Sequence, residues 1–223
     1  MPTDYFEQRL RAVKKDTMQA YLKMLLIPLL GLLLAGCNGL VVAPKAVALY
    51  DLGIVESLAM PAGQAPSQIQ LHAPSWLNSS AMQYRLEWDR PFQRRAFVES
   101  RWVANPSELL ARSLDRAILG SNPVANDCRL RIDLDEFVQV FDSESSARVE
   151  IVARAAWLPA RSDKALARKE FRLAQVSSPA TAEQGVAAYR SLSRQLSEAL
   201  VEWLGELDRG SGQGLNGRTQ CRA

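Results

Sequence analysis

The chain has 223 residues, of which 48% are hydrophobic and 23% are charged, a composition that can fill the core of one globular domain. Its net charge is +3, and setting aside the first 36 residues leaves 22 basic against 21 acidic groups, a net of +1. A nearly neutral body lacks the excess of Lys and Arg that a nucleic-acid surface requires, so the composition excludes nucleic acid as the expected partner.

The N-terminal segment has the layout of a secretory signal. An uncharged run from Met24 to Leu34 follows Lys23 and is too short to cross a bilayer. Reading on to Val42 gives roughly 18 mostly apolar residues, so an uncleaved anchor helix is the alternative, although interior Pro, Gly and Asn residues weaken it. We expect a signal peptide over residues 1–36, with Met18 as an alternative start that would give a conventional signal.

The apolar run ends in Leu34-Ala35-Gly36-Cys37, which resembles the lipobox of bacterial lipoproteins at all four positions. The resemblance implies that Cys37 is acylated and becomes the first residue of the mature chain. Several acyl chains anchor a protein far more firmly than one. Residues 37–46 would then be a lipidated tether, and this covalent lipid is the only non-protein group that we expect, with no other cofactor.

Two further cysteines, Cys128 and Cys221, remain after Cys37 is used. An even pair in an exported protein favours one disulfide, because the compartment beyond the inner membrane is oxidising. The alternative is a pair of free thiols.

Four short strands are expected first, over residues 46–54, 68–73, 79–90 and 94–104. In the first strand, Tyr50, Leu52 and Ile54 would share one face. The third strand would alternate, with one half-buried face of Met82, Tyr84, Leu86 and Trp88. The fourth would carry Phe97, Val98 and Trp102 into the next element.

A helix is then expected from Asn105 to Gly120. Asn105 would cap it, Pro106 suits its first position and Glu108 would complete the capping box. A buried stripe at helical spacing supports the prediction and consists of Leu109, Leu110, Leu114, Ala117 and Ile118.

Three strands joined by short polar connections follow, over residues 128–141, 147–158 and 166–176, and they predict an antiparallel meander. Phe137 and Phe141 break the alternation of the first of these strands. Either a bulge near Glu136 or a second contact surface would explain them.

The last element is a long helix that opens at a capping box, Thr181 to Gln184, and runs to about Leu207. Its apolar stripe would lie across the sheet. The fold class is therefore α/β, with a mixed, largely antiparallel sheet packed by at least two helices. The domain would span 47–208, and residues 209–223 would be a Gly-rich tail.

The sequence does not predict catalysis. His72 is the only histidine and lacks the spacing of a nucleophile–base pair or of a metal site. Asp133, Asp135 and Glu136 would form a solvated ion-pair lattice with neighbouring arginines. We expect no catalytic residue, no metal site and no enzyme activity.

A contact surface is a more useful prediction, since Trp and Arg are favoured at interfaces. Most of the five tryptophans lie on apolar stripes and are expected in the core. The candidate partner surface consists of Arg94, Arg95, Arg101 and Trp102.

A series of motifs resembles the ABC-type transport auxiliary lipoproteins, the group that includes the PqiC-like proteins. The motifs are the lipobox, "YDLG" at 50–53, "RWVANPSELLARSLDRAIL" at 101–119, "RLRIDLDEFVQVF" at 129–141 and the capped last helix. Their order and spacing carry the resemblance more than any single motif.

The resemblance implies a non-catalytic periplasmic subunit that acts with an ABC permease, its ATPase and an MCE-domain protein in lipid transport between membranes. Asn38 follows the lipidated cysteine where an Asp would signal inner-membrane retention, so the inner leaflet of the outer membrane is the expected location. A homo-oligomer stays open. The alternatives are a carrier that holds lipid in an apolar cavity between sheet and helix, and a structural lipoprotein of envelope assembly.

Overall fold

A computed structural model of the protein describes Met24, residues 45–120, residues 126–210 and Cys221. The predicted signal peptide, the alternative start at Met18, the lipidation site Cys37 and nearly all of the tether lie outside these residues. Residues from Ala46 onward form one compact unit.

The described residues build a single seven-stranded sheet in the order β1-β4-β3-β5-β6-β7, with β2 also pairing with β5. Strands β3–β4 and β5–β6–β7 pair antiparallel, whereas β1–β4, β2–β5 and β3–β5 pair parallel. The strands are β1 (Ala48–Tyr50), β2 (Gln68–His72), β3 (Ala81–Leu86), β4 (Arg90–Trp102), β5 (Arg129–Phe141), β6 (Ala147–Leu158) and β7 (Ala167–Ser177). The mixed, largely antiparallel sheet and the β5–β7 meander are as predicted.

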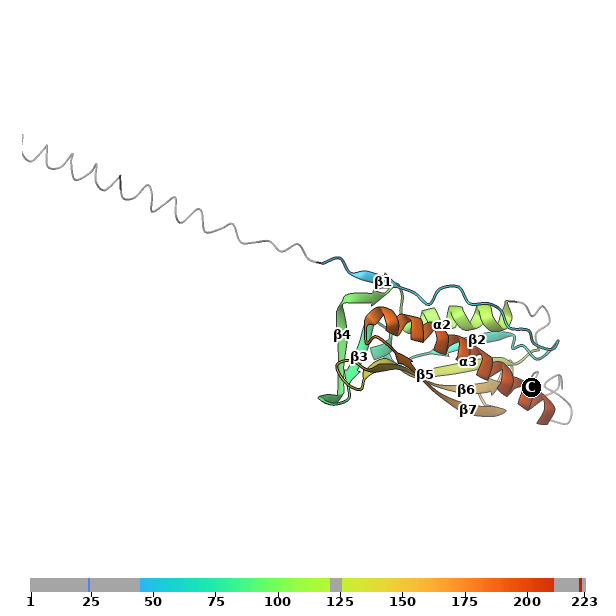
Figure 1. The fold of residues 1–223 in the computed structure, drawn as a ribbon. Coiled ribbons are helices and arrows are strands. Elements are labelled where there is room, and N and C mark those ends of the chain that lie inside the picture. The colour runs from blue at the N-terminus through green and yellow to red at the C-terminus, as the bar shows by residue number, and fades with distance from the viewer. Residues whose placement is uncertain (1–23, 25–44, 121–125, 211–220, 222–223) are drawn as a thin grey trace, which may run out of the picture. The chain divides into compact units, whose positions relative to one another are not determined.

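Both long helical elements lie on one face of the sheet (Figure 1). Helix α2 (Pro106–Leu114) continues into a π-helical turn, η2 (Asp115–Leu119), and packs against β2, while α3 (Ala182–Gly210) crosses β6 and β7. A short 3₁₀ turn, η1 (Ser75–Leu77), precedes β3. The predicted α/β class with two helices against the sheet is confirmed.

The two helix starts differ from each other. The Thr181 hydroxyl accepts a hydrogen bond from the Gln184 amide at 3.2 Å, as the capping box predicts. Asn105 precedes α2 with extended backbone but makes no side-chain cap, so that part of the prediction is wrong. Pro106 at the first position removes one amide that would otherwise need a partner, which makes a side-chain cap less necessary.

A bulge in β5 explains its irregular alternation. The register with β6 shifts between Leu134 and Glu136, so Phe137 faces the helices as Leu134 does. Phe137 stacks on Tyr189 of α3 with ring centroids 4.2 Å apart, and Trp102 meets both rings edge-on. This aromatic cluster lies between sheet and α3, and of the two explanations offered for Phe137 the bulge is correct.

Three large apolar side chains of the expected strands are exposed. Ile54, Trp88 and Val98 are 78%, 48% and 82% exposed. Strand β1 ends at Tyr50, because Gly53 turns the chain at a φ of 68° and its amide donates to the Asp51 carboxylate. Strand β3 ends before Trp88, and β3 pairs with β4 through two register shifts that disturb the alternation of β4.

Candidate partner-binding surface

The predicted surface of Arg94, Arg95, Arg101 and Trp102 does not form as one patch. Trp102 is 2% exposed and belongs to the aromatic cluster with Phe137 and Tyr189, so it cannot contact a partner. It points inward because it ends β4 on the side of the sheet that α3 covers. Arg101 alternates with it and is exposed on the opposite side.

An arginine–tryptophan contact does exist, but it uses a different tryptophan. The Arg94 guanidinium lies 4.0 Å from the ring centroid of Trp76, which is 42% exposed. Arg94 also pairs with Glu136 at 2.7 Å, and Arg85 reaches the same carboxylate at 2.9 Å. Because Glu136 holds Arg94 in place, the cation–π pair is a preorganised surface feature.

The β3–β4 hairpin adds exposed aromatic side chains beside this pair. Trp88 lies in the turn and Phe92 follows in β4, with Phe92 95% exposed. Arg95 pairs with Asp89 at 2.8 Å next to them. We call Trp76, Trp88, Phe92 and Arg94 the hairpin patch; it combines exposed aromatic rings with an arginine held by an ion pair, the composition typical of interface hot spots.

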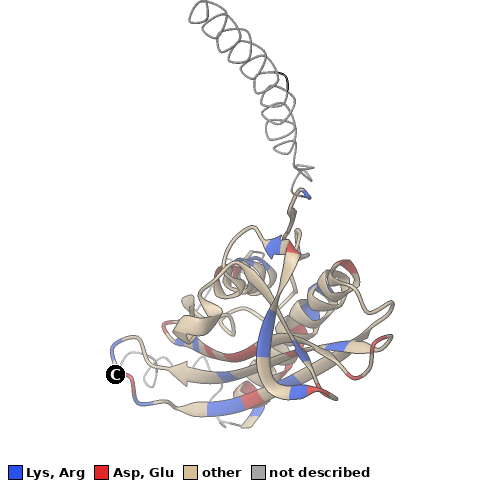
Figure 2. Cartoon of the chain, turned by 90° about the vertical axis from the view of Figure 1, so that its left-hand side faces the viewer, with Lys and Arg blue, Asp and Glu red and all other residues tan. Residues whose placement is uncertain are grey.

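The carboxylates of β5 are paired in the predicted ion-pair lattice. Basic and acidic residues are interspersed along the strands (Figure 2). On the side without helices, Arg131 pairs with Asp133 at 2.9 Å and Arg154 with Asp135 at 2.6 Å. The hydrogen bond from Arg154 holds the pKa of Asp135 below its usual value. These pairings are the ion pairs that the sequence predicts for this face.

The remaining titratable groups of interest, Tyr189, Asp115 and His72, lie apart from the ion-pair lattice. Tyr189 is buried in the aromatic cluster, and this burial raises the pKa of its hydroxyl well above the usual value. Burial also raises the pKa of Asp115 in η2. His72 lies at the exposed end of β2. Within the described ranges, no three His, Cys, Asp or Glu side chains come together in a way that could hold a metal ion.

The sequence did not predict the role of residues 51–58, which we call the strap. A groove of about 910 Å³ separates the strap from α2 and η2, and another of about 460 Å³ separates it from α3. The strap is held to η2 by two hydrogen bonds: the Leu58 amide donates to the Ala117 carbonyl at 2.7 Å and Arg116 Nε to the Val55 carbonyl at 3.0 Å. Both grooves are at the surface, outside the packed layer between α3 and the sheet.

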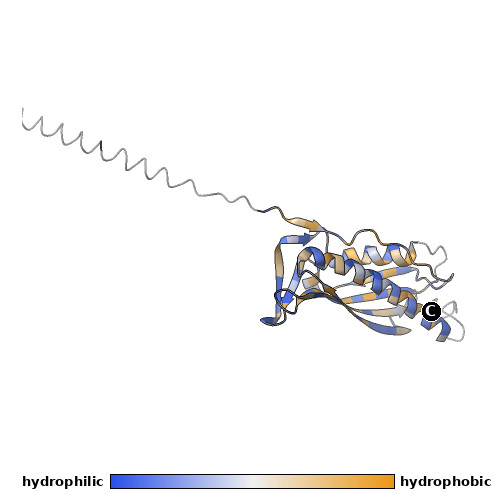
Figure 3. Cartoon of the chain, in the orientation of Figure 1, coloured by the Kyte–Doolittle hydropathy of each residue, from blue (hydrophilic) through white to orange (hydrophobic). Residues whose placement is uncertain are grey.

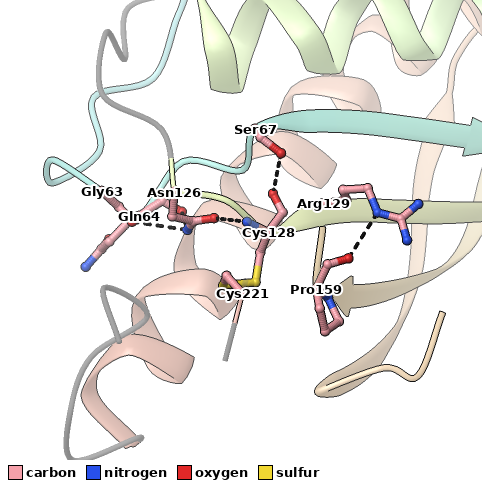
Figure 4. Close-up of a disulfide and its surroundings, with 8 residues drawn as sticks. All are labelled: Gly63, Gln64, Ser67, Asn126, Cys128, Arg129, Pro159 and Cys221. Atoms are coloured by element: carbon pink, nitrogen blue, oxygen red, sulfur yellow. Dashed lines mark hydrogen bonds between the residues drawn. A yellow bond between two sulfur atoms is a disulfide. The ribbon is translucent and has the colours of Figure 1, made fainter. Parts of the chain in front are cut away.

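The predicted disulfide joins Cys128, just before β5, to Cys221 (Figure 4). Both residues are buried, at 0% and 2% exposed. The Cys128 amide donates to Asn126 Oδ1 at 2.8 Å, and the Cys221 carbonyl accepts from the Ala160 amide at 2.9 Å. The bond therefore fastens the end of the chain to the rim of the sheet, between β5 and the β6–β7 connection.

Among the described helices, none is long and apolar enough to cross a membrane. No protein-family model matches the sequence, and no curated protein matches it. Solved structures do match.

A Xanthomonas campestris protein assigned to the family model DUF330 aligns with a TM-score of 0.62 at 20% identity, over 74% of this chain and 100% of that one. The chain shares its fold. A second protein, described as uncharacterized, aligns with a TM-score of 0.52 at 14% identity, over 72% of this chain and 99% of that one. A Caulobacter crescentus CB15 protein with a provisional lipoprotein name aligns over 45% of this chain and 83% of its own at 15% identity, but its TM-score of 0.33 is too low to support any argument.

Sequence reasoning missed Trp76, Phe92 and the strap as surface features. Trp76 is followed by Leu77, which is 1% exposed, so the sequence does not show which of these two adjacent apolar side chains lies at the surface. The nearest available sign was the pair Pro91-Phe92 after the turn, since Pro in a strand marks an edge or an irregularity.

Proposed function

We propose that this protein is a non-catalytic, lipid-anchored subunit that docks an ABC/MCE-type transport system at the outer membrane for lipid transport between membranes. The lipobox at Cys37 supports the anchor, and the motif series that resembles the PqiC-like lipoproteins supports the transport system. The paired carboxylates and the exposed histidine offer no assembled catalytic group in the described residues.

The hairpin patch is the observation that carries the docking role. Its rings are exposed, whereas Trp102 of β4 and Phe137 of β5 are buried, and Glu136 fixes Arg94 beside Trp76. Exposed aromatic groups held in one geometry lose little entropy when a partner covers them. An MCE-domain protein or the permease is the partner that the motif series favours.

Site-specific photo-crosslinking in cells tests this role. A photo-reactive phenylalanine analogue at Phe92 should give adducts that contain an MCE-domain protein or a component of the ABC transporter. The matched control is the analogue at Val176, which is 69% exposed but lies on β7. Equal adducts at both positions, or adducts at Phe92 without any transporter component, would contradict the proposal.

Outer-membrane sorting is a separate part of the proposal and rests on Asn38. The substitution Asn38→Asp should move the lipoprotein toward the inner-membrane fraction of a sucrose gradient. The control substitution Asn38→Gln should leave it in the outer-membrane fraction. Unchanged fractionation of the Asp variant would argue against sorting by this residue.

The lipid-carrier alternative has less support. Such a carrier needs an apolar cavity between sheet and helix, yet the side chains of that layer are packed: Leu192, Leu196 and Leu200 of α3 are all 0% exposed. Native mass spectrometry would detect a bound lipid. The structural-lipoprotein alternative predicts that the neighbouring genes encode no permease, ATPase or MCE-domain protein.

A further inference from the structure

A second exposed apolar surface lies at the opposite end of β4 from the hairpin, beside the point where the tether enters the domain. It consists of Val47, Leu49, Ile54 and Val103, which are 44%, 64%, 78% and 52% exposed. We call it the tether-end patch. Strand β1, which carries Leu49, is coloured as hydrophobic in Figure 3.

The backbone brings these four residues together on the outside. Tyr50 pairs in register with the buried Trp102, so Leu49 and its partner Arg101 face away from the core. The Val103 amide donates to the Tyr50 carbonyl at 2.9 Å, which continues the same ladder. Ile54 and Val103 both line the larger groove beside the strap.

The length of the tether decides what covers this patch. Val47 follows Cys37 by ten residues, so a fully extended chain holds it within about 36 Å of the acylated cysteine. A tether of this length turns the contact between patch and bilayer into an intramolecular event, for which a small surface is enough. The lipid surface is therefore the partner present at the highest local concentration.

The chemistry of the patch also fits lipid better than protein. Its side chains are aliphatic, unlike the rings and the arginine of the hairpin patch. Arg101 beside Leu49 can keep its charge in the headgroup layer while its stem contacts apolar surface. Acidic groups that line the larger groove, Asp51, Glu108 and Asp115, are matched by Arg101 nearby and by Arg112 and Arg116 in the lining. Apolar contact, not net charge, would drive the association.

We infer that the tether-end patch rests in the headgroup–acyl boundary of the bilayer that holds the lipid anchor, an inference that relies on the proposed lipidation of Cys37. Strand β4 has 13 residues and can span up to about 40 Å, so this contact holds the hairpin patch away from that bilayer and toward the partner.

Fluorescence of the mature lipoprotein in vesicles of phosphatidylethanolamine and phosphatidylglycerol tests the inference. An environment-sensitive dye is attached through Ile54→Cys, and the matched control carries it through Phe92→Cys at the far end of β4, since the two side chains are 78% and 95% exposed. Spin-labelled lipids with the nitroxide near the headgroup should quench the dye at position 54 at least threefold more than at position 92. The dye at position 54 should also shift its emission to the blue.

Two measurements separate failure of this inference from failure of the proposed anchor. Intact mass and flotation with the vesicles report lipidation of Cys37, and a protein that does not float because it is unlipidated overturns both. If the protein floats but position 54 is unquenched, or is quenched only as much as position 92, the patch does not contact the membrane. Far-UV circular dichroism checks that both labelled variants are folded.

Discussion

The two faces of the sheet use the same strand in different ways. On the face covered by α2 and α3, β5 contributes Leu134 and, after its bulge, Phe137, and these pack against helix side chains. On the outer face, Val138 and Val140 are also almost fully buried, at 0% and 1% exposed, although no helix covers them.

Arginines explain the burial on the outer face. Val140 lies in register with Arg85 of β3 and Arg148 of β6, whose side chains extend to Glu136 and Glu150. The stems of such arginines cover apolar surface while their charged ends pair. The outer face is thus a thin layer in which ion pairs replace a helix, and we expect it to contribute less stability and to depend more on pH and salt.

The largest effect should come from the aromatic cluster of the covered face. Phe137→Ala removes the ring stacked on Tyr189 and leaves a cavity that Trp102 cannot fill, so the free energy of unfolding should fall by about 3–5 kcal/mol. Urea denaturation measures it, with Phe92→Ala as a control that should change stability by less than about 0.5 kcal/mol. A loss below 1 kcal/mol at Phe137 would mean that the core is looser than described.

The disulfide should have the next largest effect. It closes a loop over a sequence separation of 93 residues, and losing it through Cys221→Ser should cost about 2–4 kcal/mol, because the unfolded chain regains freedom. The oxidised wild type and the variant are compared by urea denaturation, and the reduced wild type should match the variant. If reduction left the unfolding midpoint unchanged, the bond would be dispensable for stability.

The inner part of the lattice should contribute less. Glu136→Gln leaves Arg85 and Arg94 without their shared carboxylate in a partly buried site, which should cost about 1–2 kcal/mol. The same change should loosen Arg94 from Trp76 and weaken crosslinking at Phe92. Stability equal to that of the wild type would show that the pairs only offset their desolvation.

The exposed end of the lattice should show the smallest effect. Asp135→Asn removes the pair with Arg154 and should cost no more than about 0.5 kcal/mol at low salt. Because the pKa of Asp135 is lowered in the folded state, its contribution is present above the ordinary carboxyl pKa and is lost as the pH falls through the folded value. The difference between variant and wild type should therefore vanish in strong acid and in 1 M salt; a difference that persists there would point to packing instead.

Local periodicity explains which parts of the fold could be predicted from the sequence. The stripes of α2 and α3 and the β5–β7 meander depend on residues close in sequence, so their alternation was visible. The exposure of Trp88 and Val98 was not visible in the sequence, because β3 and β4 pair through two register shifts that no turn residue marks. The parallel pairing of β2 and β3 with β5 joins segments about 55–60 residues apart, beyond the reach of a periodic pattern.

For the contact surface, the sequence predicted the residue types but not the positions. Arginine and tryptophan do meet, but through Arg94 and Trp76, which are 18 residues apart, whereas the adjacent Arg101 and Trp102 point to opposite sides. The strap is held by contacts with residues distant in sequence, such as the hydrogen bond between Leu58 and Ala117. The grooves beside it therefore could not be predicted from the sequence of the strap alone.

The position of the disulfide also orders events during biosynthesis. Cys221 follows Cys128 by 93 residues, so in the exported chain that we propose the bond can close only after the segment between them has crossed the membrane. Strands β5 to β7 and helix α3 all lie in that segment. Closure of the bond is thus a late step, which requires that every residue of β5 to β7 and of α3 has reached the oxidising compartment.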